Sequence, residues 1–216
     1  MAATYIVDFT SLNGSGVTGT ANLDYDPDAR ALSVSFNVFG LDPNGGHVAH
    51  IHGLFANGQP ADSTTPTSAQ DTDGDGFIEL GEGAQIYGDV LLPLGDIGSN
   101  AAGVSTYSMT YDLSDSSIFN ADYDEDDLTP FELREVVIHG LTVPQGPGAG
   151  TDGEVDGTNG YLATLPVASG EIMAAGMGAV PEPGTWAMLI VGFGAIGGSL
   201  RAKGAAKRRL GKAMAA

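Results

Sequence analysis

Most of the first 173 residues alternate between apolar and polar positions with the period of two that is typical of β-strands. Glycine- and aspartate-rich stretches separate these segments, and DPDAR around Pro27 has the composition of a tight turn. One segment, TPFELRE, predicts a short helix with Thr129 as its N-cap. The expected strands are TYIVDFTSL, GTANLDY, ALSVSFNVFGL, HVAHIHG, STYSMTYDL, REVVIHGLTV and GYLATLPVASGEI.

Many short strands joined by turns predict an all-β body over residues 1–175, an antiparallel Greek-key β-sandwich or barrel. The interval from Leu54 to Gly88 is too polar for a core, so we expect a long acidic loop at the surface. Loops of that length are often functional. Two further acidic segments, residues 120–128 and 150–160, are expected to be solvated.

The hydrophobic pattern changes near the C-terminus, where Thr185–Leu200 is sixteen residues without a charge. As a helix it would span roughly 24 Å, against a hydrocarbon core of about 30 Å. Basic side chains that follow at once can reach the interface and cover the difference. We therefore expect a linker over 176–184, a transmembrane helix over 185–200 and a basic cytoplasmic tail over 201–216. A buried core helix with a disordered basic tail is the alternative.

The charge is strongly asymmetric: the chain has 27 acidic and 8 basic residues and a net charge of −19. Six of the basic residues follow position 200, so the chain before Arg201 has two basic and 27 acidic residues, a net charge of −25. Such a body repels nucleic acid and attracts cations, and no nucleic-acid partner is expected. The absence of cysteine excludes disulfides, thiolate nucleophiles and cysteine zinc sites.

The C-terminal segment contains the triplet Pro181-Glu182-Pro183, followed by WAMLIVGFGAIG and an arginine-rich end. It closely resembles the PEP-CTERM sorting signal of Gram-negative bacteria. The resemblance implies recognition by an exosortase, a transient stay in the inner membrane, removal of the tail and delivery to the cell surface or extracellular matrix. Such export needs a signal peptide, yet MAATYIVDFT has neither a basic nor an apolar region. We expect the signal peptide to be encoded upstream of Met1.

Three of the four histidines lie in HVAHIHG and the fourth lies in EVVIHG. Alternate residues of a strand share a face, so His50 and His52 lie on one side of their strand and His139 lies opposite the apolar residues of its own. If the two strands are neighbours, three imidazoles converge outside the barrel wall, and His47 can join only from the preceding loop. Such a set suits copper or zinc. The alternative is that these rings bond the backbone and one another.

The run VFGLDPNGGHVAHIHG resembles the copper-strand region of Cu/Zn superoxide dismutases, VVIHGL resembles a later copper strand, and LPVASGEI resembles the last strand. The same landmarks resemble the CHRD domain through Ala49–Gly53, His139 and Gly170–Ile172. Both resemblances imply a β-sandwich, and the dismutase implies copper at His50, His52 and His139.

The departures from the dismutase are specific. No histidine lies between His52 and His139 to bridge metals or bind zinc, Ser169 replaces a disulfide cysteine, and no arginine precedes the last strand to guide an anion. We therefore expect a sandwich of this type that has lost dismutase chemistry.

The segment DTDGDGFIELGE matches a twelve-residue EF-hand loop by residue type. Calcium takes six to eight oxygen ligands, and Ile78, at the eighth position, would dock the loop onto the body. The flanks SAQ and GEGAQ are poor helix sequences, so we expect an isolated calcium loop; a solvated Asp-Gly loop is the alternative. The expected ligands are Asp71, Asp73, Asp75, Phe77 through its carbonyl, Glu79 and Glu82.

These patterns predict an exported, exosortase-sorted protein of the cell surface or extracellular matrix: a calcium-stabilised β-sandwich binding module without catalysis. The alternative functions are a copper redox enzyme related to superoxide dismutase and a copper-sequestering module. The expected partners are the exosortase, the inner membrane and a component of the matrix.

Overall fold

The structure is a computed structural model that describes residues 2–120 and 122–176. The chain divides into two compact units, Met1–Ala175 and Gly176–Ala216. The predicted transmembrane helix, the basic tail and the triplet at 181–183 lie outside the described residues. Within the described ranges, no helix combines the length and the apolar character needed to cross a membrane.

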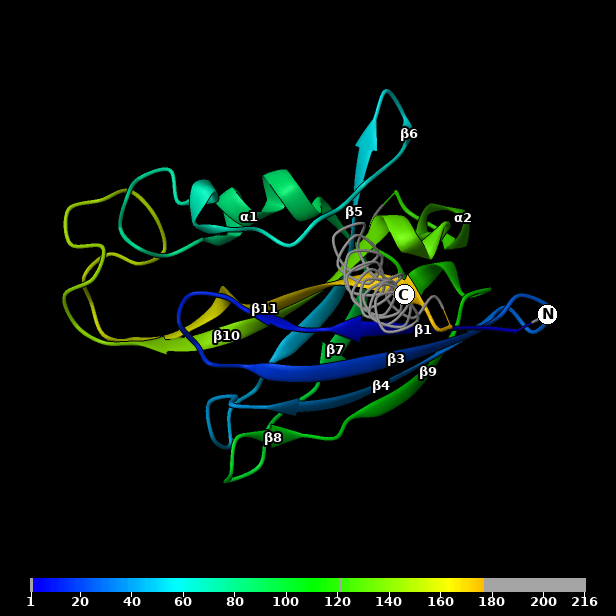
Figure 1. The fold of residues 1–216 in the computed structure, drawn as a ribbon, viewed down its shortest axis with the longest axis horizontal. Coiled ribbons are helices and arrows are strands. Elements are labelled where there is room, and N and C mark those ends of the chain that lie inside the picture. Colours follow the sequence, from blue (N-terminus) through cyan, green and yellow to red (C-terminus); the bar gives the residue numbers. More distant parts are fainter. Residues whose placement is uncertain (1, 121, 177–216) are drawn as a thin grey trace, which may run out of the picture. The chain divides into compact units, whose positions relative to one another are not determined.

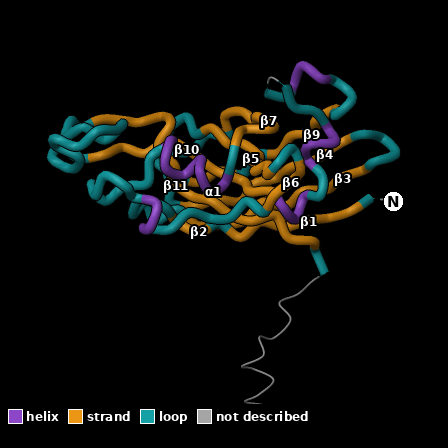
Figure 2. Tube along the Cα trace, turned by 90° about the horizontal axis from the view of Figure 1, so that it is seen from above, coloured by secondary structure: helices purple, strands orange, loops and turns teal. Residues whose placement is uncertain are grey.

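The first unit is mainly β and its paired strands are all antiparallel, which confirms the predicted class of the body (Figure 1). Short helical segments connect some of the strands (Figure 2). The strands are β1 (Ala3–Asp8), β2 (Thr10–Ser11), β3 (Thr18–Asp26), β4 (Ala31–Phe39), β5 (Val48–Ala56), β6 (Gln59–Ala61), β7 (Asp89–Asp96), β8 (Val104–Ser105), β9 (Ser108–Asp112), β10 (Arg134–Val143) and β11 (Gly160–Ala174). The helices are η1 (Ser68–Gln70), α1 (Leu80–Tyr87), η2 (Ser116–Ile118), α2 (Glu125–Leu128) and η3 (Phe131–Leu133).

One long strand joins the two halves of the sheet. The hydrogen-bonded order is β6-β5-β10-β11-β1-β3-β4-β8, with β7 beside β5, β2 beside β11 and β9 beside β4. The fifteen-residue β11 pairs along most of its length with β10 and at its end, near Ile172, with β1. The chain passes from one half to the other between β4 and β5, between β7 and β8, and between β9 and β10.

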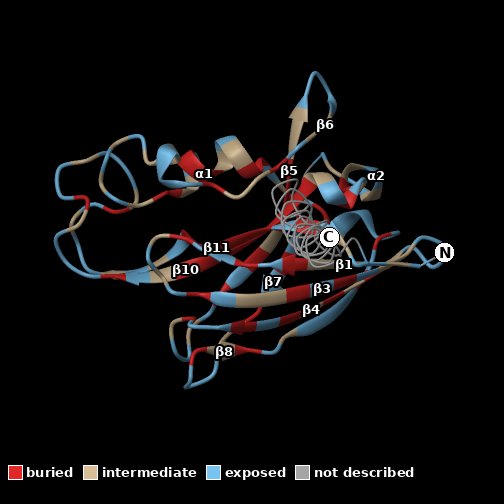
Figure 3. Ribbon diagram, viewed as in Figure 1, coloured by how far each residue is buried: buried red, intermediate tan, exposed pale blue. Residues whose placement is uncertain are grey.

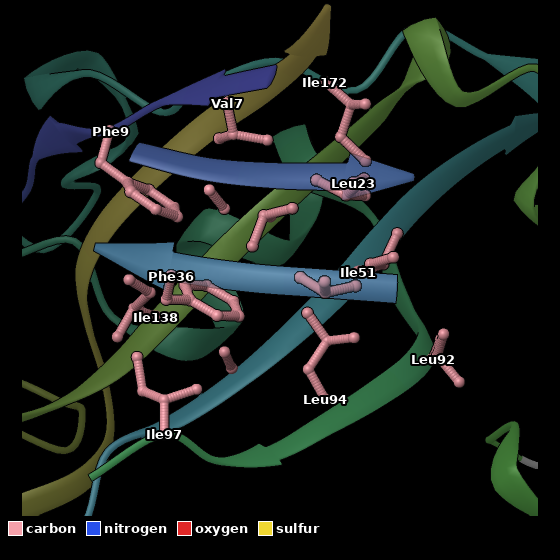
Figure 4. Packing of buried hydrophobic residues seen from close by; sticks show 14 of the residues in the cluster. Val7, Phe9, Leu23, Phe36, Ile51, Leu92, Leu94, Ile97, Ile138 and Ile172 are labelled. Carbon is pink, nitrogen blue, oxygen red and sulfur yellow. The ribbon is translucent and has the colours of Figure 1, made fainter. Parts of the chain in front are cut away.

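A single main core lies between these halves (Figure 4). The alternation predicted from sequence holds in β4, where every second residue from Leu32 to Val38 is at most 3% exposed. Burial of one such side chain contributes about 1.5–3 kcal/mol. Both halves supply the core, which includes Val7, Leu23, Phe36, Ile51, Leu92, Ile138 and Ile172. The histidine-bearing face of β5 and β10 therefore points away from this core.

The strand β7 was not predicted, because Pro93 interrupts its apolar run. In the described residues β7 pairs with β5 alone, and an edge strand tolerates a proline that cannot donate to the ladder. The Leu94 carbonyl accepts hydrogen bonds from the hydroxyls of Tyr107 at 3.2 Å and Tyr111 at 2.6 Å. Side chains thus tie β7 to the segment that contains β9.

The short helix predicted within TPFELRE is present as the 3-10 turn η3, but its predicted N-cap, Thr129, is wrong. Thr129 is the C-cap of α2, and Pro130 favours extended backbone at the residue before it, so only the short turn η3 follows. Asp124 caps α2 through its side chain. The segment 120–128, which was expected to be solvated, therefore contains a helix whose Leu128 is fully buried.

The interval from Leu54 to Gly88, expected to be a surface loop, begins within the sheet, because β5 continues to Ala56 and β6 pairs with it. Only the part after Ala61 leaves the sheet, and that part is not simply solvated. The interval includes β6, η1 and α1, and α1 packs against β5 and β11 (Figures 1 and 2). Buried residues run along it (Figure 3), among them Ile78 and Tyr87, which are 6% and 0% exposed. This interval covers the face of the sheet that carries the histidines.

Candidate metal centres

Three histidines converge on the outer face of the sheet. His50 and His52 come from β5 and His139 comes from the neighbouring β10. The ring centroids lie 5.1, 5.6 and 6.0 Å apart. One ring nitrogen of each histidine lies within 4.8 Å of the other two, a spacing that could hold a metal ion.

Backbone carbonyls fix the orientation of two of these rings. His52 Nδ1 lies 2.9 Å from the Gly88 carbonyl oxygen, and His139 Nδ1 lies 2.6 Å from that of Thr164. Because a carbonyl only accepts, each neutral ring carries its proton on Nδ1 and keeps a lone pair on Nε2. Both Nε2 atoms, and His50 Nδ1, are buried without a hydrogen-bond partner. Metal-binding histidines are held in this way.

The surroundings keep these imidazoles uncharged at neutral pH. Burial lowers the pKa of His52 to about 3 and that of His139 to about 4, and it also lowers the pKa of His50. A metal binds the neutral ring, so no proton has to be displaced from the nitrogens that face one another.

The rings lie on the predicted face, but their expected position outside the barrel wall is wrong in one respect, because that face is covered. His52 and His139 are only 2% and 1% exposed. Tyr87, at the end of α1, places its ring 4.6 Å from that of His52. A Cβ at position 83 would lie 2.5 Å from the Tyr87 ring, so only a glycine at this position leaves room for that ring.

His47 does not join the other three rings. It is fully buried, with Nε2 3.2 Å from the Asp42 carbonyl oxygen and Nδ1 3.3 Å from that of His139. The group of mutually close ligand nitrogens contains His50, His52 and His139 without it. His47 instead braces its loop against β10.

A second cluster lies in the acidic loop, where carboxylate oxygens of Asp71, Asp73 and Glu82 come within 4.8 Å of one another. The Asp71 carboxylate accepts the N–H groups of two loop glycines at 2.8 and 3.0 Å. Glu82 accepts the N–H and hydroxyl of Thr72, at 2.5 and 2.7 Å, and the N–H of Glu79 at 3.0 Å. The loop backbone thus holds one set of oxygens in place.

Other carboxylate oxygens of the loop have no partner. Oδ2 of Asp73 and Oδ2 of Asp75 are buried without a hydrogen bond, although Asp75 Oδ1 accepts the Phe77 N–H at 2.7 Å. Burial, and then the charges of Asp73, Asp71 and Glu82, raise the pKa of Asp75. A bound cation would relieve both the burial of charge and the repulsion between like charges.

Glu79 lies outside the group of mutually close carboxylate oxygens, and the predicted role of the Phe77 carbonyl as a ligand stays a prediction. Glu79 turns toward the segment 150–160, where its Oε1 accepts the Val155 N–H at 2.7 Å. Val155 is 1% exposed and forms a small apolar cluster with Val143, against which Phe77 packs. The segment 150–160, which was predicted to be solvated, is therefore packed on the acidic loop.

The expectation of an isolated loop without flanking helices is wrong. The turn η1 precedes the loop, and α1 begins directly after Glu79, where Glu82 completes a capping box. Packing of Tyr87 on Gly83 and on the sheet offsets the low helix propensity of two glycines. Ile78, which was predicted to dock the loop, is buried. The amide oxygen of Asn13 accepts the Ile78 N–H at 2.6 Å, and the amide nitrogen of Asn13 donates to the Ile78 carbonyl at 2.8 Å.

Sequence reasoning missed a third group, Glu135, on the same face of β10 as His139. It is fully buried, and its Oε1 accepts the hydroxyls of Thr65 and Ser169, both at 2.5 Å, while Oε2 has no partner. Burial raises the pKa of Glu135 to about 7. A carboxyl inside EVVIHG has no pattern in the sequence that distinguishes it from a surface acid.

Comparison with known families identifies the C-terminal segment. Residues 179–203 match the PEP-CTERM protein-sorting motif, which confirms the resemblance noted in the sequence. The motif implies a protein that is exported, processed by an exosortase and sorted to the cell surface. No curated protein matches the chain.

Proposed function

We propose that this exported protein is a metal-binding module of the cell surface or extracellular matrix, with a transition metal at His50, His52 and His139 and calcium in the acidic loop. One observation carries the proposal: the three histidines bring one ring nitrogen each within 4.8 Å of one another, each has a buried ring nitrogen without a hydrogen-bond partner, and backbone carbonyls orient two of the rings. Calcium would stabilise the fold, and no catalysis is proposed.

The donor set favours copper or zinc. Neutral imidazoles suit both ions, and the burial of His52 and His139 leaves little room for the water that hard cations retain. The strand order supports a Greek-key sandwich like those of the CHRD domain and Cu/Zn superoxide dismutase, because the chain crosses between the halves of the sheet at β4–β5. Such a site would sequester a metal ion that reaches the cell surface.

A dismutase-like redox enzyme is the second candidate, favoured by the same three histidines. The charge opposes it, because a body with 27 acidic residues repels superoxide. Of the two arginines in the described part of the chain, Arg30 pairs with Glu125 on the surface. Arg134 is fully buried and stacks on Phe55. Neither arginine is placed to guide an anion to the histidines.

Metal titration of the purified full-length protein, freed of metal first, tests the proposal. We expect one equivalent of copper or zinc to bind, and His139→Ala to weaken binding by about 100-fold or more. His47→Gln is the matched control, since His47 is equally buried but outside the cluster, and it should bind as the parent does. Unchanged binding by His139→Ala would place the metal elsewhere. Rapid superoxide consumption by the copper-loaded protein would favour the second candidate.

A further inference from the structure

The helix α1 is the first structural connection between the acidic cluster and the histidine cluster. Glu82, in its first turn, belongs to the acidic cluster, and Gly88, directly after its last residue, supplies the carbonyl that holds His52. Six residues of helix span about 9 Å. Tyr87 packs on Gly83 within the helix and on His52 outside it. A shift of α1 therefore moves both the support and the cover of His52.

The C-terminal end of α1 has little room to move independently of β5. A Cβ on Gly88 would lie 2.2 Å from the Gly53 carbonyl oxygen of β5, and φ at Gly88 is +86°. Glycine alone fits this close approach. The end of α1 is thus tightly fitted to the strand that carries His50 and His52.

A second link runs through the segment 150–160 to His139. The Thr164 carbonyl holds the His139 ring, and the Thr164 hydroxyl donates to Glu154 Oε2 at 2.8 Å. The next residue, Val155, donates its N–H to Glu79 of the acidic loop at 2.7 Å. Both carbonyls that orient the histidines therefore belong to segments tied to the acidic loop.

We propose that the acidic loop regulates the histidine cluster: a divalent cation bound among Asp71, Asp73 and Glu82 increases the affinity of His50, His52 and His139 for their metal. This inference rests on the proposed function. Without a cation, the buried Oδ2 atoms of Asp73 and Asp75 have no hydrogen-bond partner, and the carboxylates of Asp71, Asp73 and Glu82 lie close together at the start of α1. With a cation, α1 and the segment 150–160 are fixed, and the Gly88 and Thr164 carbonyls are preorganised.

The test measures zinc affinity of the full-length protein, in a mild detergent, by competition with a chromophoric chelator. We expect millimolar calcium to tighten zinc binding by about 5-fold or more, within the usual range of coupling between two sites. By the reciprocity of linkage, saturating zinc should tighten calcium binding by the same factor.

Two variants separate the coupling from simple misfolding. Glu82→Gln should lose the calcium effect and keep the zinc affinity that the parent shows without calcium; Asp73→Asn, at a more exposed ligand, should do the same. Glu132→Gln removes an exposed carboxylate of η3 and should behave as the parent. Glu154→Gln should still bind calcium but show a smaller effect of calcium on zinc.

The outcomes distinguish the inference from the function on which it rests. If both ions bind but neither changes the affinity of the other, the coupling is refuted and the proposed function stands. If calcium or zinc fails to bind at all, the coupling and that part of the proposed function fall together.

Discussion

At the scale of single residues, Glu135 is the clearest departure from what its position in the chain suggests. Its carboxyl connects β10 to two other segments, because it accepts hydrogen bonds from Thr65 of the interval from Leu54 to Gly88 and from Ser169 of β11. Burial raises its pKa to about 7, and the charges of Glu171 and Asp62 act in the same direction. The native protein therefore holds a proton here that the unfolded chain, with an ordinary glutamate pKa, releases near pH 4.5.

This difference predicts a pH dependence of stability. Between about pH 4.5 and 7 the native state binds the proton more tightly, so the contribution is full below pH 4.5 and is lost as the pH rises through 7. The free energy of unfolding of the parent should therefore fall by up to about 3 kcal/mol over this pH range, at about 1.4 kcal/mol per pKa unit. Glu135→Gln has no such carboxyl and should not show this fall. Urea unfolding of both proteins at pH 5 and pH 8 measures it, with Glu132→Gln as the exposed control. Parallel pH profiles for parent and Glu135→Gln would contradict the prediction.

At the scale of elements, the interval from Leu54 to Gly88 contains the acidic loop and α1 and attaches both of them to the sheet. Asn13 fastens Ile78 through two backbone bonds and reaches Pro166 of β11 at 2.9 Å. The acidic loop is thus attached to the body at its eighth position, while its carboxylates repel one another. Without a cation its local stability should be low.

Calcium should therefore raise the melting temperature. At a calcium concentration of 100 times Kd the gain is about 2.7 kcal/mol, or roughly 5–10 °C for a body of this size. The double variant Asp71→Ala, Glu82→Ala should show no such rise. A control with Asp28→Ala and Glu132→Ala removes as much charge from exposed positions and should keep it. Calorimetry with and without calcium decides, and a rise that survives in the first variant locates calcium elsewhere.

The strands were predictable where one face alone is buried, because burial of alternate residues leaves a period of two, as in β4. The strand β7 and the helix α1 were not, since Pro93 and Gly83 are tolerated only through tertiary contacts. The sequence placed His50 and His52 on one face, but it could not show that α1 covers them. The Gly88 and Thr164 carbonyls leave no trace in a sequence, because every residue has one.

At the scale of the whole chain, the C-terminal motif directs sorting, and the charge is distributed unequally on the two sides of the apolar segment. The acidic residues all precede Arg201 and the basic tail follows it, so the two ends of the apolar segment differ sharply in charge. If the apolar segment crosses the inner membrane, this difference in charge would keep the basic tail on the cytoplasmic side.

Replacement of Pro181-Glu182-Pro183 by alanines should block removal of the tail, because the motif at 179–203 implies processing by an exosortase. We expect the uncleaved chain to accumulate in the membrane fraction, with a higher mass on immunoblots. Pro144→Ala, at an exposed position of the body, should be processed normally. Normal processing of the triple variant would rule out the motif as the recognition element.

The shared strand β11 has a mechanical consequence. The first unit ends at Ala175, directly after β11, so a force pulling on its C-terminal side along the axis of this strand would act on β11 first. Hydrogen bonds to β10, β2 and β1 lie across that axis and would be loaded in shear, many at once, rather than unzipped singly. If the protein is held at the cell surface through its C-terminal side, the force would act on the one strand that pairs with both halves of the sheet, and pulling that strand out would separate them.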